Sequence, residues 1–411
     1  MRKAVHEVFT PKKEFNASMY VERPELERQL ARSLKKNIHT FLFGESGNGK
    51  SWLFQRVLKQ EEIPYIVANC GNASRQKSIT SEIRSSIIDP GTATKKGYQE
   101  TKQGELNLTF AKGGLSHEGQ YDLEQTEPLL EAFQAFSARH KGKKIIVLDN
   151  LEAIFSSAEL MHELADILML LDDPRYGTHD INLLIVGVPN NILEYYSSID
   201  NLDSIANRIQ EIDRVGSLSP EQVREILIKG FKQLEVSITE PQLSMICKHT
   251  HRVTLGIAQR IHEYCEILSY QIEDNNWNFS ENLLEKADEE WLKQGFRKSY
   301  TVIESHLNSK ETSVARRNQV IYVIGKIRQH SFDSNRITKL IEDEFPETIP
   351  ETNMGIGNIL AELASGSQPL LRKINKTREY SVTDPRYIMC IRLMLIKESK
   401  SNRVSKKRFR V

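Results

Sequence analysis

The chain is poor in cysteine, in long apolar segments and in net charge, and each shortage excludes a class of protein. Its four cysteines lie far apart in 411 residues, with no CxxC pair. This spacing argues against a disulfide framework or a cysteine-rich metal site and fits a reducing cytosol. No apolar run approaches the roughly 18 residues that span a bilayer, and the N-terminal stretch lacks the apolar core of a signal peptide. We therefore expect a soluble, cytoplasmic protein.

The net charge of +1 conceals an uneven distribution along the chain. Residues 310–411 hold 20 Lys and Arg against 11 Asp and Glu, a balance of +9, whereas the rest of the chain holds 36 against 44, a balance of −8. The length predicts two or three domains at about 150 residues each. The last quarter is therefore the part that we expect to meet a polyanion.

A glycine-rich stretch, GESGNGKS, occupies residues 44–51. An apolar run at 40–43 precedes it and predicts a buried strand, and apolar residues at helical spacing follow it. Strand, loop and helix together give G-x-x-x-x-G-K-S the context that a phosphate-binding loop requires. The expected nucleotide contacts are Gly44, Glu45, Ser46, Gly47, Asn48, Gly49, Lys50, Ser51 and Trp52.

The physical chemistry of phosphate binding explains this choice of residues. Phosphate oxygens must come close to backbone N–H groups, and the three glycines have no Cβ to block them. The next helix adds the positive end of its dipole. Lys50 then reaches the β- and γ-phosphates as a point charge, and the Ser51 hydroxyl suits Mg²⁺.

A second motif, KKIIVLDNLEAIF, supplies acidic groups. The apolar run 145–148 predicts a strand buried on both faces of a parallel sheet, and Asp149 follows at its carboxyl end, where such sheets bind ligands. We assign Asp149, with Ser51, to Mg²⁺. Glu152 either orients the attacking water or is a solvated acid at a helix start.

A third apolar strand, INLLIVGVPNN, also ends in polar residues. Asn190 or Asn191 would sense the γ-phosphate or hold the attacking water. The alternative is that these asparagines only form a local turn after Pro189.

Several segments, taken in chain order with these motifs, resemble the AAA+/STAND group of P-loop ATPases, and within it the origin-recognition initiators. YVERPELERQL is similar to the segment that opens the family's core, and GVPNN to its sensor strand. SIANRIQEIDRVGSLSPEQVREIL is similar to the segment with an arginine finger and the entry to the lid helices, and THRVTLGIAQRIHEYCEIL to the lid's sensor helix. This resemblance covers about residues 18–290.

The resemblance implies that the chain binds ATP with Mg²⁺, and it assigns three arginines. Arg23 would lie near the adenine, and Arg208 would act as a finger on the phosphates of a neighbouring subunit. A surface salt bridge is the alternative role of Arg208. In the sensor helix Arg260 would face the nucleotide, with His262 as the alternative, because Ala258 replaces the family's proline there.

After residue 314 the pattern predicts three helices, the second capped by Asp333, and then short strands at 371–374 and 379–382. This is the order of a winged helix, which is also the C-terminal module of initiator-type ATPases. Arg372, Lys373, Lys376 and Arg378 would lie on the wing and contact phosphates of double-stranded DNA. The expected recognition helix, 353–364, has no Lys or Arg, so docking of a protein is the alternative.

The predicted fold is therefore α/β, with a three-layer P-loop NTPase built on a parallel sheet, a helical lid and a C-terminal winged helix. The expected domains are an ATPase core (1–217) with an adenine-proximal N-terminal segment and a hairpin insertion near 90–121, a lid and connector (218–309), the winged helix (310–396) and a flexible basic tail (397–411).

The expected function is an ATP-hydrolysing switch that couples its nucleotide state to homo-oligomerisation and DNA binding. Proteins of this appearance serve in replication, transposition and antiphage defence, and any effector would be a separate chain. The alternative is a nucleotide-binding scaffold with little turnover whose last module docks a protein. Asn150 favours this alternative, because many AAA+ ATPases have a catalytic glutamate at its position.

Overall fold

The structure of the chain is a computed structural model in two compact units, Glu22–Val215 and Met1–Val21 with Gly216–Val411. It describes residues 2–11, 15–88, 127–188, 207–308, 315–327, 329, 331–375, 377–398, 402–407 and 409. The insertion expected near 90–121 lies outside these residues. Within the described part of the chain, no helix is both long enough and apolar enough to cross a membrane.

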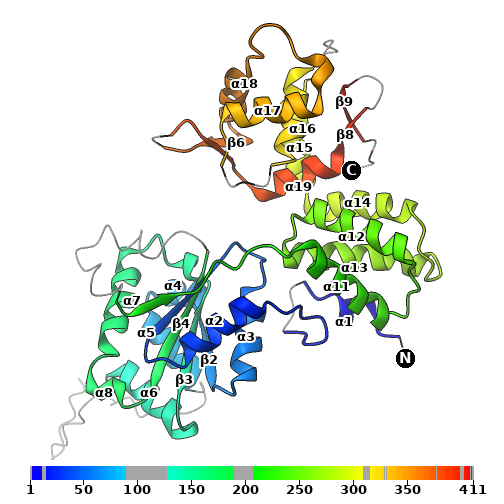
Figure 1. Cartoon of the computed structure of the whole chain (residues 1–411). Helices are drawn as coiled ribbons and strands as arrows, with labels where there is room; N and C mark the ends of the chain where they lie inside the picture. The colour runs from blue at the N-terminus through cyan, green and yellow to red at the C-terminus, as the bar shows by residue number, and fades with distance from the viewer. Residues whose placement is uncertain are drawn as a thin grey trace, which may run out of the picture. The chain divides into compact units, whose positions relative to one another are not determined.

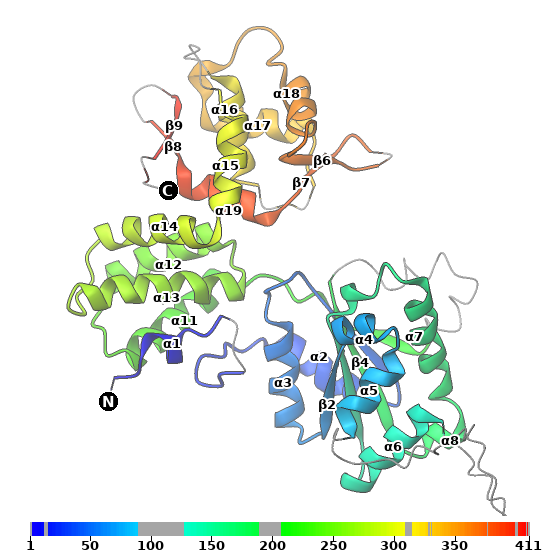
Figure 2. The same cartoon turned by 180° about the vertical axis from the view of Figure 1, so that it is seen from behind.

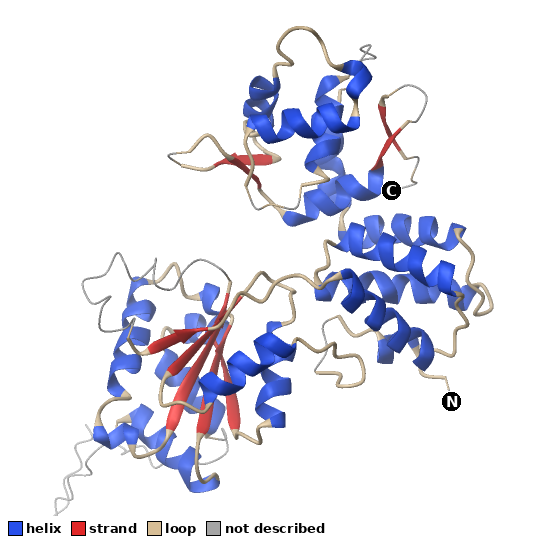
Figure 3. Ribbon diagram, in the orientation of Figure 1, coloured by secondary structure: helices blue, strands red, loops and turns tan. Residues whose placement is uncertain are grey.

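The unit Glu22–Val215 is built on a five-stranded sheet in the order β2-β3-β4-β1-β5, with every pair parallel (Figures 1 and 3). The strands are β1 (His39–Phe43), β2 (Tyr65–Asn69), β3 (Lys144–Asp149), β4 (Ile181–Gly187) and β5 (Ile209–Glu211). Because all five strands run the same way, their carboxyl ends meet at one edge of the sheet.

Alternate residues of the central strands face opposite sides of the sheet, as the two-residue period of a strand requires. Ile146 and Leu148 of β3 belong to one apolar core, whereas Ile145 and Val147 belong to the other. The first core is closed by α4 (Cys70–Gln76), α5 (Ile79–Ile87), α6 (Pro128–Arg139), α7 (Ala158–Leu170) and α8 (Pro174–Gly177). The second is closed by α2 (Pro24–Leu34) and α3 (Lys50–Gln60), which confirms the predicted three-layer α/β fold (Figure 2).

The other unit begins with four helices that follow the sheet and includes the start of the chain. These helices are α11 (Pro220–Gln233), α12 (Glu240–Thr254), α13 (Ala258–Asp274) and α14 (Asn282–Gly295). The short helix α1 (Val5–Val8) contacts α13. The expected grouping of residues 1–21 with the ATPase core therefore differs from the structure.

Burial of Phe9 explains this grouping. Its ring is fully buried and lies against Gly230 of α11, where a Cβ would come within 2.2 Å of its Cζ atom. The ring also meets His262 of α13 edge-on at 6.0 Å, and the next residue donates its N–H to the Nδ1 atom of this histidine. The apolar start of the chain thus packs on α11 and α13.

The last part of the chain contains the predicted helices and strands. After α15 (Arg297–His306) come α16 (Arg316–Ile324), α17 (Ser334–Glu344), the 3-10 turn η2 (Pro346–Thr348), α18 (Ile356–Leu363), β6 (Leu371–Lys373), β7 (Tyr380–Val382) and α19 (Pro385–Met394). Asp333 caps α17 by accepting the N–H of Arg336, as predicted. Strands β6 and β7 pair antiparallel.

The tail is not the free cation that its composition suggested. Strand β9 (Val404–Lys406) pairs antiparallel with β8 (Leu395–Lys397), and the N–H of Lys407 donates to the carbonyl of Met394. The charge count alone missed the backbone pairing and the buried Val404 side chain that hold this segment.

Candidate nucleotide-binding site

The phosphate loop runs from the end of β1 to the start of α3, at the carboxyl edge of the sheet. Helix α3 begins at Lys50, so the last loop residues lie at its N-terminus. Gly47 and Gly49 have φ angles of +84° and +86°, a left-handed region that side-chain-bearing residues rarely adopt. The two glycines therefore allow the backbone path that turns loop N–H groups toward a ligand.

Gly44 has a second reason to lack a side chain, beyond the one that the sequence suggested. A Cβ at this position would lie 2.5 Å from the carbonyl oxygen of Val215, the last residue of the unit. Val215 also donates its N–H to the carbonyl of Phe43 at 2.8 Å. The close passage of this distant segment, and not only the approach of a phosphate, excludes a side chain at Gly44.

Asn48 joins the loop to the same segment. Its side chain is 1% exposed, and its Nδ2 atom donates to the carbonyl of Val215 at 3.2 Å. Its own carbonyl accepts from the Nη2 atom of Arg23 at 2.7 Å. Arg23, assigned to the adenine side by resemblance, is thus held against the phosphate loop.

The Lys50 side chain folds back over its own loop. Its Nζ atom donates to the carbonyls of Gly44 at 2.7 Å and Glu45 at 3.1 Å. Burial lowers the pKa of Lys50, and the nearby carboxylates Glu152, Asp149 and Glu45 oppose this shift. An incoming phosphate would offer this partly desolvated ammonium a charged partner in place of two neutral carbonyls.

Asp149 ends β3 and accepts the N–H of Asn150 at 2.9 Å. Burial raises the pKa of Asp149, whereas this N–H, the Lys50 charge and a hydrogen bond from Ser51 lower it. Ser51 and Asp149 therefore meet, although 98 residues separate them in the sequence.

These two oxygen donors fit a magnesium ion that keeps most of its waters. Mg²⁺ is usually held by one or two protein oxygens together with substrate phosphates and water. In the part of the chain that the structure describes, no three His, Cys, Asp or Glu side chains gather into a metal cluster. The two oxygen donors of Ser51 and Asp149 suit a metal that arrives with a phosphate.

Glu152 lies on the 3-10 turn η1 (Leu151–Ala153), directly after the Asp149 strand end. Its side chain is exposed, and its charge acts on Lys50 more strongly than that of Asp149 does. Asn150 is also exposed and has a φ of +60°. The structure therefore places a carboxylate beside the phosphate loop two residues beyond the usual glutamate position.

The remaining predicted site residues are dispersed. Trp52 lies in the first turn of α3. Arg208 precedes β5, beside the first residue of β1 and so at the opposite edge of the sheet from the loop, where its Nε atom pairs with Asp172 at 2.5 Å. Arg260 lies on α13 in the other unit and pairs with Glu263 at 2.6 Å. Asn190 and Asn191 lie outside the described residues.

Sequence reasoning missed two residues that lie near the phosphate loop, at the carboxyl ends of the strands. Arg214 forms an ion pair with Glu45 of the loop. Asn69 ends β2 in register with Asp149, and its side chain accepts the N–H of Gly71 at 2.8 Å. The polar end of an apolar strand could have revealed Asn69, whereas nothing in the local pattern marks Arg214.

Three of the four expected DNA-contacting residues lie in the described part of the β6–β7 hairpin. Arg372, Lys373 and Arg378 are exposed, and Lys376 lies outside the described residues. The Nε atom of Arg372 donates to the Ser381 hydroxyl across the hairpin at 2.8 Å. This contact orients one of the exposed cations.

Comparisons with known proteins agree with this geometry. Residues 34–195 match the family model described as AAA domain. A Walker-type ATPase of Pyrococcus abyssi has a similar structure, with a TM-score of 0.52, 16% identity, and 94% of this chain and 99% of that chain covered. The ORC2 protein of Aeropyrum pernix, solved in ADPNP–ADP complexes, gives a TM-score of 0.51 at 14% identity and covers 94% of this chain and 96% of its own.

No curated protein in the comparison matches the sequence. At these identities the likeness to solved structures concerns the fold. Together with the family match, it agrees with the resemblance that the motifs indicated: residues 34–195 match the AAA domain model, and the chain has a fold similar to those of this Walker-type ATPase and this ORC2 protein.

Proposed function

We propose that the protein is an ATP-binding and ATP-hydrolysing AAA+/STAND switch that couples its nucleotide state to self-association and DNA binding. The observation that carries this proposal is the meeting of Lys50, Ser51 and Asp149 at one edge of the sheet. These are the groups that a P-loop ATPase needs to hold a triphosphate and its metal.

Each group has a role in this proposal. The loop N–H groups and Lys50 bind the β- and γ-phosphates, and Ser51 and Asp149 hold Mg²⁺, which neutralises phosphate charge when bound. Glu152 orients the attacking water and accepts its proton. Arg208, far from the loop of its own chain, contacts the γ-phosphate of a neighbouring subunit.

In this proposal the C-terminal module, α15–α19, binds DNA with an affinity that depends on the bound nucleotide. Three helices followed by an antiparallel hairpin are the order of a winged helix, and the exposed Arg372, Lys373 and Arg378 suit phosphate contacts. We place this activity in replication, transposition or antiphage defence, with a separate protein as any effector.

An ATPase assay with and without double-stranded DNA, at two salt concentrations, tests the proposal. Turnover by the wild-type chain, lost in Lys50→Ala, is the expected result. Particle mass measured with ATP, with ADP and without nucleotide tests self-association. An ATP-dependent increase that Arg208→Ala abolishes supports the trans-acting role, and an unchanged mass contradicts it.

Asn150 favours a second candidate function, a nucleotide-binding scaffold with negligible turnover. In that case ATP binds tightly without hydrolysis, DNA mobility stays unchanged, and the last module docks a protein. Equilibrium binding of a fluorescent ATP analogue, measured beside the turnover assay, separates the two functions. A failure to bind any nucleotide with magnesium would exclude both.

A further inference from the structure

The lysines of the C-terminal segment contact carboxylates and carbonyls of their own chain. Lys406 pairs with Glu304 of α15, and Lys407 lies 3.5 Å from the Oδ2 atom of Asp288 on α14. Lys397 donates to the carbonyl of Glu344 at the end of α17. A segment that serves only to bind a polyanion would have little need of these intramolecular partners.

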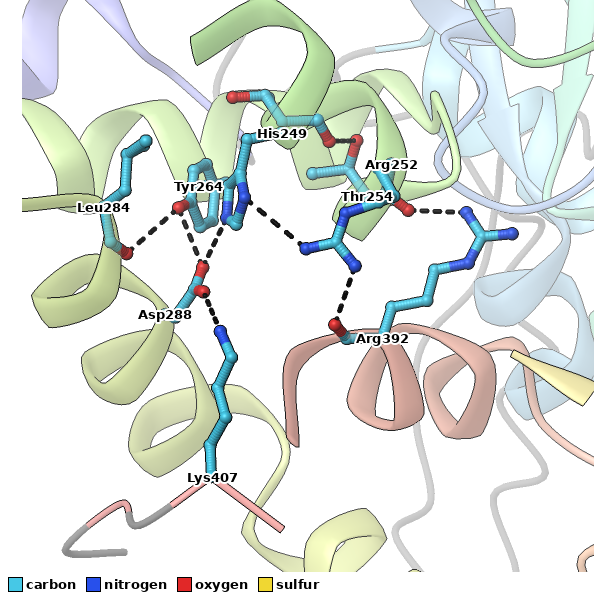
Figure 4. Close-up of polar contacts among 9 residues, drawn as sticks. His249, Arg252, Thr254, Tyr264, Leu284, Asp288, Arg392 and Lys407 are labelled. Atoms are coloured by element: carbon cyan, nitrogen blue, oxygen red, sulfur yellow. Dashed lines mark hydrogen bonds and ion pairs between the residues drawn. The ribbon is translucent and has the colours of Figure 1, made fainter. Parts of the chain in front are cut away.

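Asp288 is the most deeply placed of these partners, with 1% of its side chain exposed. A buried carboxylate is costly unless it is paired and hydrogen-bonded. Figure 4 shows three groups around it: the Nε2 atom of His249 at 2.7 Å, the hydroxyl of Tyr264 at 2.9 Å, and Lys407. These groups come from α12, from α13 and from the residue after β9.

A second contact lies beside the first. The Nη1 atom of Arg252, on α12, donates to the carbonyl of Arg392, on α19, at 2.9 Å, and the Nη1 atom of Arg392 donates to the carbonyl of Arg252. Figure 4 shows these two arginines crossing between the helices. Arg252 also approaches the ring of His249 at 3.5 Å, which joins the two contacts.

We infer that Lys407–Asp288 and the reciprocal Arg252–Arg392 pair form a clamp that joins the four-helix group α11–α14 to the module α15–α19 as one rigid body. Modules linked in one chain usually move relative to each other unless their interface is large and apolar. Here charged donors close the interface around a buried acid. The C-terminal segment is therefore a strap that fixes the module.

The consequence for function rests on the proposed ATP switch. Any nucleotide-driven movement of α11–α14 would carry the exposed β6–β7 hairpin with it, without a hinge in between. The clamp itself needs no nucleotide. A measurement of the distance between the two parts without ATP or DNA therefore tests the clamp alone. Its result does not depend on whether the proposed ATP switch is correct.

Spin labels on Lys232→Cys, an exposed residue of α11, and Lys339→Cys, an exposed residue of α17, provide the test in the full chain. The four native cysteines are buried and so are poor competitors for the label. Without ligands the clamp predicts one narrow distance distribution. In the double variant Arg252→Ala with Lys407→Ala, hydrogen bonds to charged groups are lost. The fraction of molecules in which the module α15–α19 has separated from α11–α14 should therefore rise about tenfold or more.

Lys397→Ala is the matched control, because its contact stays within the module. It should keep the narrow distance distribution. Lys407→Arg should keep it too, because this variant retains the cation and leaves Arg252 intact. Far-UV circular dichroism verifies that each variant is folded. A broad distribution in the wild type, or a distribution in the double variant as narrow as that of Lys397→Ala, would overturn the inference.

Discussion

Asn48, in the glycine-rich loop, donates its side-chain amide to the carbonyl of Val215, the residue at which the unit Glu22–Val215 ends. Gly44 makes room for the same carbonyl, and Arg214 pairs with Glu45. Three loop residues thus contact the segment that leads to the helical unit. The loop and this segment form one local structure, although about 170 residues separate them in sequence.

Removal of the Asn48 amide should weaken this structure. Asn48→Ala leaves the buried carbonyl of Val215 without its side-chain partner, and we expect the free energy of unfolding of Glu22–Val215 to fall by about 1–3 kcal/mol. Denaturant unfolding measures the change. The control is Ser46→Ala at an exposed position of the same loop, with an expected effect within about 0.5 kcal/mol. Equal losses in both variants would contradict the role of the Asn48 bond.

Substitutions of Glu152 and of Asp149 should affect different steps, the first the turnover of ATP and the second its metal-dependent binding. Glu152→Gln should keep ATP affinity and lower kcat by about 10²-fold or more, because a general base contributes on that scale. Asp149→Asn should instead remove the magnesium dependence of ATP binding. Single-turnover kinetics and ATP titrations with and without Mg²⁺ make the measurement. Full turnover in Glu152→Gln would show that this carboxylate is only a solvated acid.

Two buried histidines should make the protein sensitive to mild acid. Burial lowers the pKa of His39 and of His262 to about 4, and each Nδ1 atom accepts a backbone N–H. Because the unfolded value is about 6.5, their stabilising effect is complete above pH 6.5 and is lost as the pH falls toward 4. The expected loss is about 3 kcal/mol per histidine.

The unfolding free energy measured between pH 6.5 and 5 tests this sign, since most carboxylates remain ionised there. His262→Gln should reduce the slope for the helical unit and leave that of Glu22–Val215 unchanged. Stability that stays constant or increases over this interval would contradict the burial of neutral histidines.

Two glycine-to-alanine changes should have opposite effects. Gly230→Ala on α11 brings a Cβ to 2.2 Å from the Phe9 ring, so we expect a loss of about 1–3 kcal/mol from overpacking. Gly357→Ala on α18 meets no atom within 4 Å and should stabilise by up to about 1 kcal/mol through helix propensity. Thermal unfolding of both variants provides the comparison. Phe9→Leu combined with Gly230→Ala should recover part of the loss.

The hairpin cations should act as phosphate contacts. Lys373→Ala and Arg378→Ala should each weaken binding of unrelated DNA sequences to a similar extent and lower the slope of log affinity against log salt by about 1. Fluorescence anisotropy over a salt series measures both quantities. Lys397→Ala serves as the control, because Lys397 belongs to the C-terminal segment and not to the β6–β7 hairpin. An equal loss of slope in this control would assign DNA contact to the C-terminal segment instead.

Local patterns in the sequence pointed to the parts of the candidate site that adjoin strand ends, and the functional roles of these residues stay predictions. Lys50 and Ser51 lie in one contiguous motif, and Asp149 was recognisable as an acid at the end of an apolar run. The Arg214–Glu45 pair and the Asn48–Val215 bond have no such signal, because they depend on how β5 returns beside β1. One clue was overlooked: Gly230 inside a helical pattern indicates a close approach, and Phe9 makes it.

Charge counting failed for the tail for a related reason. The surplus of Lys and Arg was real, but a count does not reveal that Asp288 and Glu304 lie next to Lys407 and Lys406. Asp288 is buried and Glu304 is exposed, and each pairs with a lysine that only the fold brings close to it. Composition therefore predicted where the positive charge lies along the chain, and only the tertiary structure showed how much of it is already compensated.

The helical unit is formed from both ends of the chain, so the polypeptide passes between the two units twice, after Val21 and after Val215. Arg23 and Val215 flank these two passages, and both are bonded to Asn48. Asn48 therefore bonds, inside the unit Glu22–Val215, to residues beside both points at which the chain leaves this unit, so a change at this one loop position would alter the contacts at both points.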